Sequence, residues 1–455
     1  MEKRYFGTDG VRGVVGKEPM TAGFLLRLGY VAGRVLIKRH LEQDNKNRPS
    51  VLIGKDTRFS GHMIEAALEA GFTASGVDVT LCGVLPTPGV AFLTKELCFT
   101  AGVVISASHN LFEDNGVKFF SGDGFKFPDE FEIEVEHALA LETSVGCNKT
   151  LDLGRVHSMS DAEEKYIDFC KSTFPAGMSL RGIKIIIDCA NGAAYRVAPK
   201  VFRELGATVV VIGDNPDGFN INASCGATSP ANIRAAVLEH GANIGIAFDG
   251  DADRVMMVDH TGRIYDGDEL LYIIVSNRAK HENIAGVVGT LMTNMALEKA
   301  LCHQGINFMR AKVGDRYVVE LLRKQGWLYG GENSGHIIRL DQHTTGDGTV
   351  ASLQVLAAFC ESNKLLSQLV EPLTLFPQKM INMRIPDGFD WEAHMSILEA
   401  KRDAESELGT NGRVLLRLSG TEPVLRIMVE SKSEEQSKRL AEQIAAIIKK
   451  VAEKV

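Results

Sequence analysis

The sequence lacks several features that would assign it to a class of protein. No apolar run among its 455 residues approaches the roughly 20 residues needed to span a bilayer, so we expect no membrane partner. The N-terminus, MEKRYFGTDG, has no apolar signal segment, and none of the eight cysteines forms a CxxC pair. We therefore expect a soluble, cytoplasmic protein with reduced, mostly buried thiols and no zinc site.

An excess of positive charge is also missing. Lys and Arg number 50 against 58 Asp and Glu, which gives a formal net charge of -8. An acidic surface gains little from nucleic acid or from an anionic membrane, so we predict neither as a partner, while a local basic pocket could still bind a small anion. Hydrophobic residues make up 45% and charged residues 24%, as is typical of a soluble globular protein.

The length predicts about three or four domains. Apolar runs alternate with helical patterns three times over, which is the signature of βαβ units. We predict strands at 51–53, 77–81, 102–105, 183–187, 208–212, 244–248 and 286–289. We predict helices at 61–74, at 295–302, at 317–325 and directly after Ser229 and Pro230, taken as N-cap and first helical residue.

The pattern changes after about residue 370. We predict strands at 379–385, 414–418 and 424–429, a charged helix after the first of them, and a final helix with Ser433 and Gln436 as a capping box. The apolar residues that share one face of that helix are Leu440, Ile444, Ile447, Ile448 and Val451. The predicted fold class is α/β, with three similar α/β domains and a small α+β C-terminal domain. The predicted boundaries are 1–156, 157–256, 257–370 and 371–455.

Ser108 lies in a polar loop that directly follows the predicted strand at 102–105. The carboxyl end of a strand in an α/β sheet is where ligands usually bind. A hydroxyl with His109 and Lys118 close by could be phosphorylated and could pass the phosphoryl group on. The alternative is a turn rich in Ser and Asn that only caps the next element.

Asp249, Asp251 and Asp253 stand at alternate positions in a loop after another apolar strand. Two unit charges ~4 Å apart repel by about 4 kcal/mol at an effective dielectric of 20, so converging carboxylates need a cation or a proton. Oxygen ligands without His or Cys favour Mg²⁺. An EF-hand loop is excluded because Arg254 and His260 stand where that loop needs glycine and glutamate. A solvated acidic turn is the alternative.

A third loop places Glu332, Ser334 and His336 between glycines. Sugar hydroxyls need acceptors and donors at close range, and glycine lets the backbone approach them. A helix-capping turn is the alternative. A fourth loop, 417–423, combines Ser, Gly and Thr with Arg417 and the following Arg426, which suits a phosphate. A tight hairpin is the alternative there.

Together these four loops resemble those of the α-D-phosphohexomutase superfamily, from Tyr5 to about Glu430. The opening Phe6–Gly13 and the segments Gly54–Arg58 and Asp217–Asn222 resemble further parts of that family. Within it the chain is most similar to the glucosamine branch. The resemblance implies four domains round a central cleft, and interconversion of glucosamine 6-phosphate and glucosamine 1-phosphate through a 1,6-bisphosphate, in the service of amino-sugar nucleotide and cell-wall precursor synthesis.

The resemblance also implies a role for each matching residue. It implies Ser108 as the phosphoserine and as a ligand, with Asp249, Asp251 and Asp253, of one Mg²⁺ per subunit. It implies that Lys118, Arg12 and His336 lie near the transferring group, with acid and base roles unassigned. The sugar-binding residues would be Glu332 and Ser334. The phosphate-binding residues would be Arg417, Ser419, Gly420, Thr421 and Arg426.

Three residues depart from the family pattern. Leu111 stands where proline usually follows His-Asn, Asn333 where glutamine is common, and Leu418 where a polar residue is frequent. We expect Leu111 to loosen the serine loop slightly and Leu418 to remove a phosphate contact. Glucose or mannose phosphate as the substrate, and a non-catalytic sugar-phosphate sensor, are the alternative functions. A homodimer is the candidate assembly, which the sequence does not test.

Overall fold

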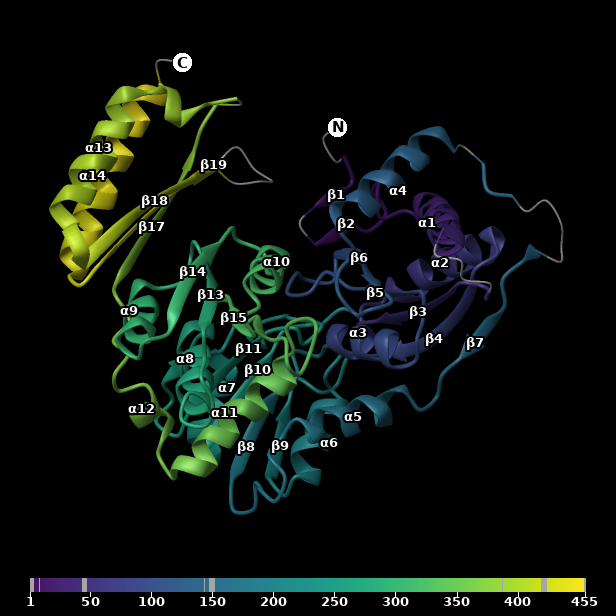
Figure 1. Cartoon of the computed structure of the whole chain (residues 1–455), viewed down its shortest axis with the longest axis horizontal. Helices are drawn as coiled ribbons and strands as arrows, with labels where there is room; N and C mark the ends of the chain where they lie inside the picture. Colours follow the sequence, from purple (N-terminus) through teal and green to yellow (C-terminus); the bar gives the residue numbers. More distant parts are fainter. Residues whose placement is uncertain are drawn as a thin grey trace. The chain divides into compact units, whose positions relative to one another are not determined.

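The computed structural model describes residues 4–7, 9–42, 47–142, 144–146, 152–386, 388–418 and 424–453. These residues form two compact units (Figure 1). The first consists of residues 1–290 and 309–369, and the second of residues 291–308 and 370–455. Among the described residues, no helix is both long and apolar enough to cross a membrane.

A seven-stranded sheet organises the first part of the chain, in the order β1-β2-β6-β5-β3-β4-β7. Its strands are β1 (Phe6–Gly7), β2 (Gly10–Val14), β3 (Ser50–Lys55), β4 (Asp78–Val84), β5 (Ala101–Ile105), β6 (Asp114–Ser121) and β7 (Val156–Ser158). Its helices are α1 (Ala22–Glu42), α2 (Gly61–Ser75), α3 (Thr87–Glu96) and α4 (Asp129–Leu141). Strands β3, β4, β5 and β7 are parallel, whereas β6 runs antiparallel to β5 and β2.

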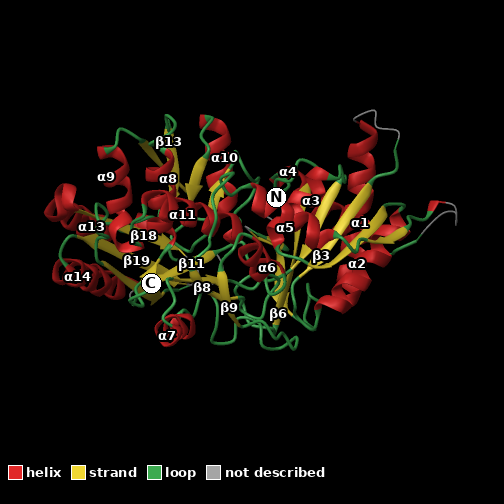
Figure 2. Cartoon of the chain, turned by 90° about the horizontal axis from the view of Figure 1, so that it is seen from below, coloured by secondary structure: helices red, strands yellow, loops and turns green. Residues whose placement is uncertain are grey.

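Helices cover both faces of this sheet (Figure 2), and its central strands β3 and β5 are buried along nearly their whole length. Val51 and Ile53 belong to the core cluster that includes α1, α2 and α4. Gly54 faces the other way, where a Cβ would lie 2.5 Å from Val90 of α3. The strand alternation therefore places α3 opposite the α1–α2 pair.

The second sheet repeats this plan in the order β12-β11-β10-β8-β9. Its strands are β8 (Lys184–Asp188), β9 (Thr208–Ile212), β10 (Ile244–Phe248), β11 (Val255–Asp259) and β12 (Ile264–Tyr265). Its helices are α5 (Ala162–Ser172), α6 (Val197–Glu204) and α7 (Ala231–His240). Helix α7 begins one residue later than predicted: Pro230, not Ser229, is its N-cap, and the Ser229 N–H is already used in a turn to Gly226.

The third sheet has the order β14-β13-β15-β16. Its strands are β13 (Gly286–Thr290), β14 (Asn307–Ala311), β15 (Tyr329–Gly331) and β16 (Ile337–Arg339). The helices of this part of the chain are α8 (Gly267–Arg278), α9 (Met295–His303), α10 (Asp315–Gln325), α11 (Gly348–Ser362) and α12 (Leu366–Leu369). Buried Val318 and Leu322 of α10 pack against this sheet beside Val288.

The second unit contains a three-stranded antiparallel sheet, β17-β19-β18, covered on one face by two helices (Figure 1). Besides α9, this unit contains β17 (Gln378–Arg384), β18 (Gly412–Leu418), β19 (Val424–Ser431), α13 (Met395–Leu408), α14 (Glu434–Ala452) and the 3₁₀ turns Trp391–Ala393 and Gly409–Asn411. Ser433 caps α14 as predicted, but the reciprocal half of the capping box is replaced: the Gln436 side chain accepts from Ser431 and donates to Glu407.

The chain thus forms three α/β parts, each with its own sheet, followed by an α+β part, as the sequence predicts. The strands that return after the loops, β6, β11 and β16, were not predicted. They make each of the first three loops the turn of an antiparallel hairpin, and β18–β19 does the same for the fourth. The boundaries between the four predicted domains stay a prediction.

Candidate active site

Ser108 occupies the turn between β5 and β6, with its backbone in the left-handed region at φ 53°. The residue is only 1% exposed. Its hydroxyl donates a hydrogen bond of 2.6 Å to Asp249 Oδ2, and its Oγ lies 3.5 Å from His109 Nδ1. A serine that only capped the next element would bond to a nearby backbone group, whereas this hydroxyl points at a carboxylate 141 residues away in the chain.

The three aspartates lie in the turn between β10 and β11. Their carboxylate oxygens lie within 4.8 Å of one another, and all three side chains are buried. The chain curls tightly here because Ala252 adopts φ 59° and Gly250 packs directly on the serine loop, where a Cβ would lie 2.5 Å from the Ser108 carbonyl oxygen. This turn is therefore buried and not a solvated acidic loop.

Lys118 of β6 is the nearest cation to the aspartates. Its ammonium lies 2.7 Å from Asp251 Oδ2 and 3.5 Å from Asp253 Oδ2. Burial opposes the charge of Lys118, but Asp251 and the neighbouring Asp9 outweigh that effect and raise its pKa. Burial, together with the charges of Asp253 and Asp251, raises the pKa of Asp249 well above its usual range.

Lys118 and Asp253 also belong to a closed ring of alternating charged and ionisable groups. Its six members are Asp9, Lys118, Asp253, His336, Asp315 and Lys126. Neighbouring charged atoms approach within 3.1 Å for Asp9 and Lys118, 3.6 Å for Asp253 and His336, and 2.6 Å for Asp315 and Lys126. The six side chains belong to segments in or next to the first, second and third sheets. The ring therefore links these three sheets through electrostatic interactions.

Three ring members were missed by the sequence analysis: Asp9, Lys126 and Asp315. Asp9 stands in the opening motif Phe6–Gly13 and could have been suspected from it. Lys126 and Asp315 stand in none of the motifs singled out in the sequence, and they pair with each other although they are far apart in the chain. Arg12, which was predicted, pairs with Asp9 at the edge of this ring.

His109 lies next to Ser108, and Arg254 lies next to His109. Burial, and then the charge of Arg254, lower the pKa of His109 to about 4, so the imidazole is neutral near pH 7. Arg254 Nη1 lies 3.3 Å from His109 Nδ1. The neutral ring therefore holds one lone pair between a guanidinium and the serine hydroxyl.

The third loop turns between β15 and β16. The Glu332 carboxylate accepts from the backbone N–H of Gly314 at 2.9 Å, and the Ser334 hydroxyl is buried without a hydrogen-bond partner among the described residues. The carbonyl of Asn333 accepts from Gly267, the first residue of α8, so the loop also contacts a helix terminus. His336 alone of the predicted residues here reaches the ring described above.

Of the predicted phosphate-binding residues, Ser419, Gly420 and Thr421 lie outside the described residues. Arg417 and Arg426 are direct cross-strand partners on β18 and β19, which form the hairpin considered as the alternative. Like charges directly opposite one another destabilise a sheet unless an anion or a carboxylate lies near them. That these two arginines bind a phosphate group stays a prediction.

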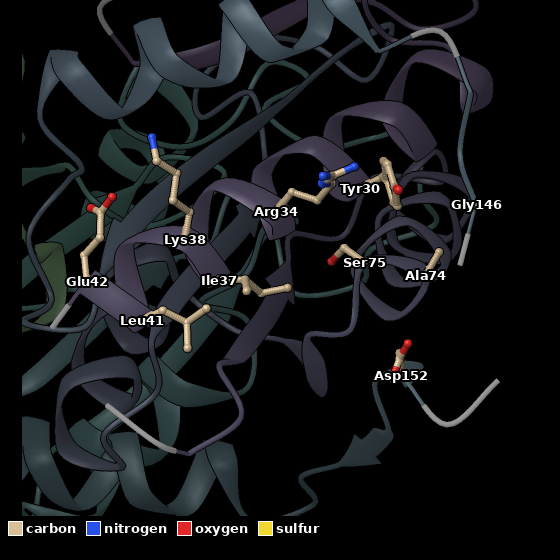
Figure 3. Close-up of a pocket in the computed structure, with 10 residues that line it drawn as sticks. All are labelled: Tyr30, Arg34, Ile37, Lys38, Leu41, Glu42, Ala74, Ser75, Gly146 and Asp152. Carbon is tan, nitrogen blue, oxygen red and sulfur yellow. The ribbon is translucent and has the colours of Figure 1, made fainter. Parts of the chain in front are cut away.

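A cavity of about 670 Å³ opens beside α1 and α2 (Figure 3). None of the predicted site residues lines it. Two of its cations are already paired, Arg34 with Glu142 and Lys38 with Glu134. The cavity is therefore not part of the candidate active site around Ser108.

Comparison with known proteins assigns the family. The four parts of phosphoglucomutase/phosphomannomutase match in order: alpha/beta/alpha domain I at residues 3–145, domain II at 164–262, domain III at 266–376 and the C-terminal domain at 380–447. The phosphoglucosamine mutase of Herminiimonas arsenicoxydans is 56% identical over 98% of this chain and 100% of its own. That of Cupriavidus pinatubonensis is 56% identical over 99% of this chain and 100% of its own.

The chain belongs to the phosphohexomutase family. It is an enzyme of the isomerase class. Solved structures share the fold at low identity: a phosphoglucomutase/phosphomannomutase family protein from Burkholderia thailandensis superimposes with a TM-score of 0.80 at 21% identity, covering 98% of each chain. The N-acetylphosphoglucosamine mutase of Aspergillus fumigatus, solved with GlcNAc-6P and magnesium, gives 0.67 at 15% identity, covering 99% of this chain and 96% of its own.

The phosphohexomutase aspartates fit a divalent cation on their own geometry. Asp251 Oδ1 and Asp253 Oδ1 are buried and accept no hydrogen bond from any described residue. Buried carboxylate oxygens are rarely left without a partner. The donor set is oxygen only, which suits Mg²⁺. Thr87 at the start of α3 orients the Asp251 carboxylate, because its hydroxyl donates a hydrogen bond to Asp251 Oδ2 at 2.6 Å.

The three departures from the phosphohexomutase pattern leave these groups in place. Leu111 is half exposed, and its carbonyl accepts from Arg58, so the backbone is held at this residue without a proline. Asn333 contributes its backbone carbonyl, as described above. Leu418 is 45% exposed at the end of β18.

Proposed function

We propose that this phosphohexomutase interconverts glucosamine 6-phosphate and glucosamine 1-phosphate and thereby supplies amino-sugar nucleotides and cell-wall precursors in the cytoplasm. The relatives named above, 56% identical over nearly the whole chain, support the substrate. The observation that carries the reaction is the hydrogen bond from Ser108 to Asp249 inside a buried aspartate trio.

In the proposed reaction Ser108 carries a phosphoryl group. The P–O bond to Ser108 breaks while a bond to O1 of glucosamine 6-phosphate forms, the O1 proton passes to a base, and Ser108 Oγ takes up a proton. The product is glucosamine 1,6-bisphosphate. After the bisphosphate turns round, its 6-phosphoryl group returns to Ser108 and glucosamine 1-phosphate leaves. Phosphoryl transfer depends mainly on positioning and on charge neutralisation.

The carboxyl groups at the site favour the binding of a cation. Five of them, Asp9, Asp249, Asp251, Asp253 and Asp315, belong to the ring and the aspartate loop. A phosphoryl group brings further negative charge, so without compensation these groups would repel it. Asp249, Asp251, Asp253 and Ser108 would hold one Mg²⁺ per subunit, which would neutralise phosphoryl oxygens.

The remaining residues have positioning and proton-transfer roles in this proposal. Lys118, held charged by its carboxylates, would neutralise the transferring group together with Arg12. His336, enclosed by Asp253 and Asp315, is the candidate for moving a proton. Glu332 and the unpaired hydroxyl of Ser334 would meet sugar hydroxyls. The phosphate that is not being transferred would bind Arg417, Ser419, Gly420, Thr421 and Arg426, and the assembly would be a homodimer.

Intact mass measurement with peptide mapping of freshly purified protein tests this function. We expect one phosphate on the peptide that contains Ser108, and its loss when glucosamine 6-phosphate is added. A competition between glucosamine 6-phosphate and glucose 6-phosphate in one coupled assay then tests the substrate. Phosphate that stays on Ser108 in the presence of every hexose phosphate would contradict a mutase and favour a sensor.

A further inference from the structure

Two sequence motifs of this chain, Gly54–Arg58 and Asp217–Asn222, have no part in the reaction described so far. In the structure each sends one side chain to the backbone of the serine loop. Arg58 lies in the loop between β3 and α2, and Asn222 lies in the segment that follows β9. Both side chains reach the same two carbonyl groups, those of Ser108 and Asn110.

The guanidinium of Arg58 is completely buried and bonds three loop carbonyls. Its Nη2 donates to Ser108 O at 3.0 Å and to Asn110 O at 2.8 Å, and its Nη1 donates to the carbonyl of Leu111. The Nδ2 of Asn222 donates to Ser108 O at 2.8 Å and to Asn110 O at 2.9 Å. The carbonyl of Ser108 therefore has both of its lone pairs occupied.

The N–H of Ser108 is fixed by the same network. It donates to Ser106 Oγ at 2.9 Å, and that hydroxyl donates to Asp56 Oδ2 at 2.6 Å. Asp56 in turn accepts from the Nε of Arg58 at 2.9 Å and from the Arg58 backbone N–H at 2.9 Å. The C=O of Ser108 therefore bonds to Arg58 directly, and its N–H is connected to Arg58 through Ser106 and Asp56.

Ser108 needs such support because it adopts φ 53°, a conformation that costs a non-glycine residue free energy relative to the right-handed region. The surrounding hydrogen bonds must therefore stabilise this backbone conformation. The conformation decides where Oγ points, and Oγ has to face Asp249. Because a displacement of about 1 Å can slow a positioned reaction by about 100-fold, control of this backbone is control of the transfer step.

We propose that Arg58 and Asn222 are positioning residues that clamp the serine loop and hold Ser108 in its reactive conformation. The proposal rests on the proposed function, in which Ser108 carries the phosphoryl group. The bonds of Arg58 and Asn222 go to the backbone of the serine loop and not to the carboxylates of Asp249, Asp251 and Asp253, so the clamp acts on the loop that carries the nucleophile.

The test is the variant R58K in the full-length enzyme. Lysine keeps the positive charge but cannot direct parallel bonds at several carbonyls. We expect kcat to fall by about 100-fold, with KM for glucosamine 6-phosphate changed by no more than about threefold. Transfer of labelled phosphate from Ser108 to the sugar in a single turnover should slow by the same factor as kcat.

The matched control is R413K. Arg413 in the second unit also binds one carboxylate through Nε, that of Glu430 at 2.8 Å, and two carbonyls through its terminal nitrogens, those of Leu291 at 2.7 Å and Thr293 at 2.6 Å. We expect its kcat to stay within about twofold of wild type. An equal loss in R413K would show that any such arginine matters for general integrity, and would overturn the clamp.

A second variant, N222A, covers the case in which R58K fails to fold. It removes one of the two donors, so we expect a fall in kcat of about 10-fold with KM unchanged. Wild-type kcat in whichever variant folds, or a rise in KM at constant kcat, overturns the positioning role. If the wild-type enzyme carries no phosphate on Ser108, the proposed function fails together with the clamp, whereas labelled wild type with unimpaired variants removes the clamp alone.

Discussion

The two hairpin turns that meet at the active site are held in place by different forces. The serine loop is fixed through its backbone, by hydrogen bonds from Arg58 and Asn222 to its carbonyls. The aspartate loop is fixed through its side chains, by the ammonium of Lys118 and by the ring to which Asp253 belongs. One turn offers a single neutral hydroxyl, and the other offers three carboxylates.

The difference separates two properties of the enzyme. Directional hydrogen bonds to the backbone decide where the nucleophile lies, and they depend on geometry more than on charge. Ion pairs in a buried ring act over longer distances, and each carboxylate depends on all neighbouring cations. We therefore expect changes in the serine loop to affect the rate of transfer, and changes in the ring to affect stability and cation binding.

The largest effect is expected from Ser108→Ala. Turnover should fall at least about 10⁴-fold, because the change removes the hydroxyl that would carry the phosphoryl group. The melting temperature should stay within about 4 °C of wild type, since the change removes one hydrogen bond worth about 1 kcal/mol. A coupled assay and a thermal melt check both parts. Turnover like that of wild type would exclude Ser108 as the nucleophile and end the contrast between the two turns.

Lys126→Met tests the charged side of the comparison. Lys126 lies between Asp9 and Asp315, and burial opposes its charge, but both carboxylates outweigh burial and raise its pKa. Removing one partner of a buried ion pair leaves uncompensated charge, so we expect a loss of about 3–5 kcal/mol in the free energy of unfolding. Denaturant unfolding measures it.

Two further variants sharpen that measurement. The double variant K126M/D315N should recover part of the loss, because the uncompensated carboxylate is then neutral. The control K171M removes a lysine that also lies between two carboxylates, Asp168 and Glu204, but at the surface, where a pair contributes at most about 1 kcal/mol. Equal losses in K126M and K171M would mean that the ring gives no special stabilisation.

Much of this architecture could be predicted from the sequence because it is local. The apolar runs of β3, β8, β9 and β10 and the amphipathic face of α14 appear within single segments. The return strands could not be predicted in the same way. β6 begins with polar Asp114 and Asn115, which in one dimension look like a continuing loop, and only pairing with β5 and β2 makes it a strand.

The residues of the candidate site also differ in whether a local sequence pattern predicts them. Ser108 and the three aspartates could be predicted because each stands in a motif that directly follows a strand. The bond between Lys126 and Asp9 joins residues 117 apart, and no local pattern at Lys126 predicts it. Motif Gly54–Arg58 was visible in the sequence, but its function was not, because the carbonyls that Arg58 binds belong to another strand's loop.

Asp251→Asn tests whether the aspartate loop binds the cation. One ligand charge is lost, so we expect the Mg²⁺ concentration for half-maximal activity to rise about 100-fold, equivalent to about 3 kcal/mol. Asp188→Asn is the control, because Asp188 is a buried aspartate of β8 whose oxygens accept only from the backbone of Ala190 and Gly226 among the described residues. Calorimetric Mg²⁺ titration should change in D251N alone. An unchanged titration in D251N would remove the loop from the metal site.

The smallest expected effect is that of Thr87→Val, which addresses a directional hydrogen bond from α3 to the aspartate loop. Valine has nearly the shape of threonine but cannot donate to Asp251 Oδ2. A hydrogen bond to a charged group contributes about 1.5–3 kcal/mol, part of which would be recovered by Lys118, so we expect Mg²⁺ affinity to fall about 10-fold. Thr94→Val is the matched control on the same helix, since among the described residues the Thr94 hydroxyl bonds only to the Val90 carbonyl. If T87V and T94V shift the Mg²⁺ titration equally, the Thr87 hydrogen bond does not help to position the aspartate loop for the cation. The ion pairs of Lys118 would then be the main interaction that holds Asp251.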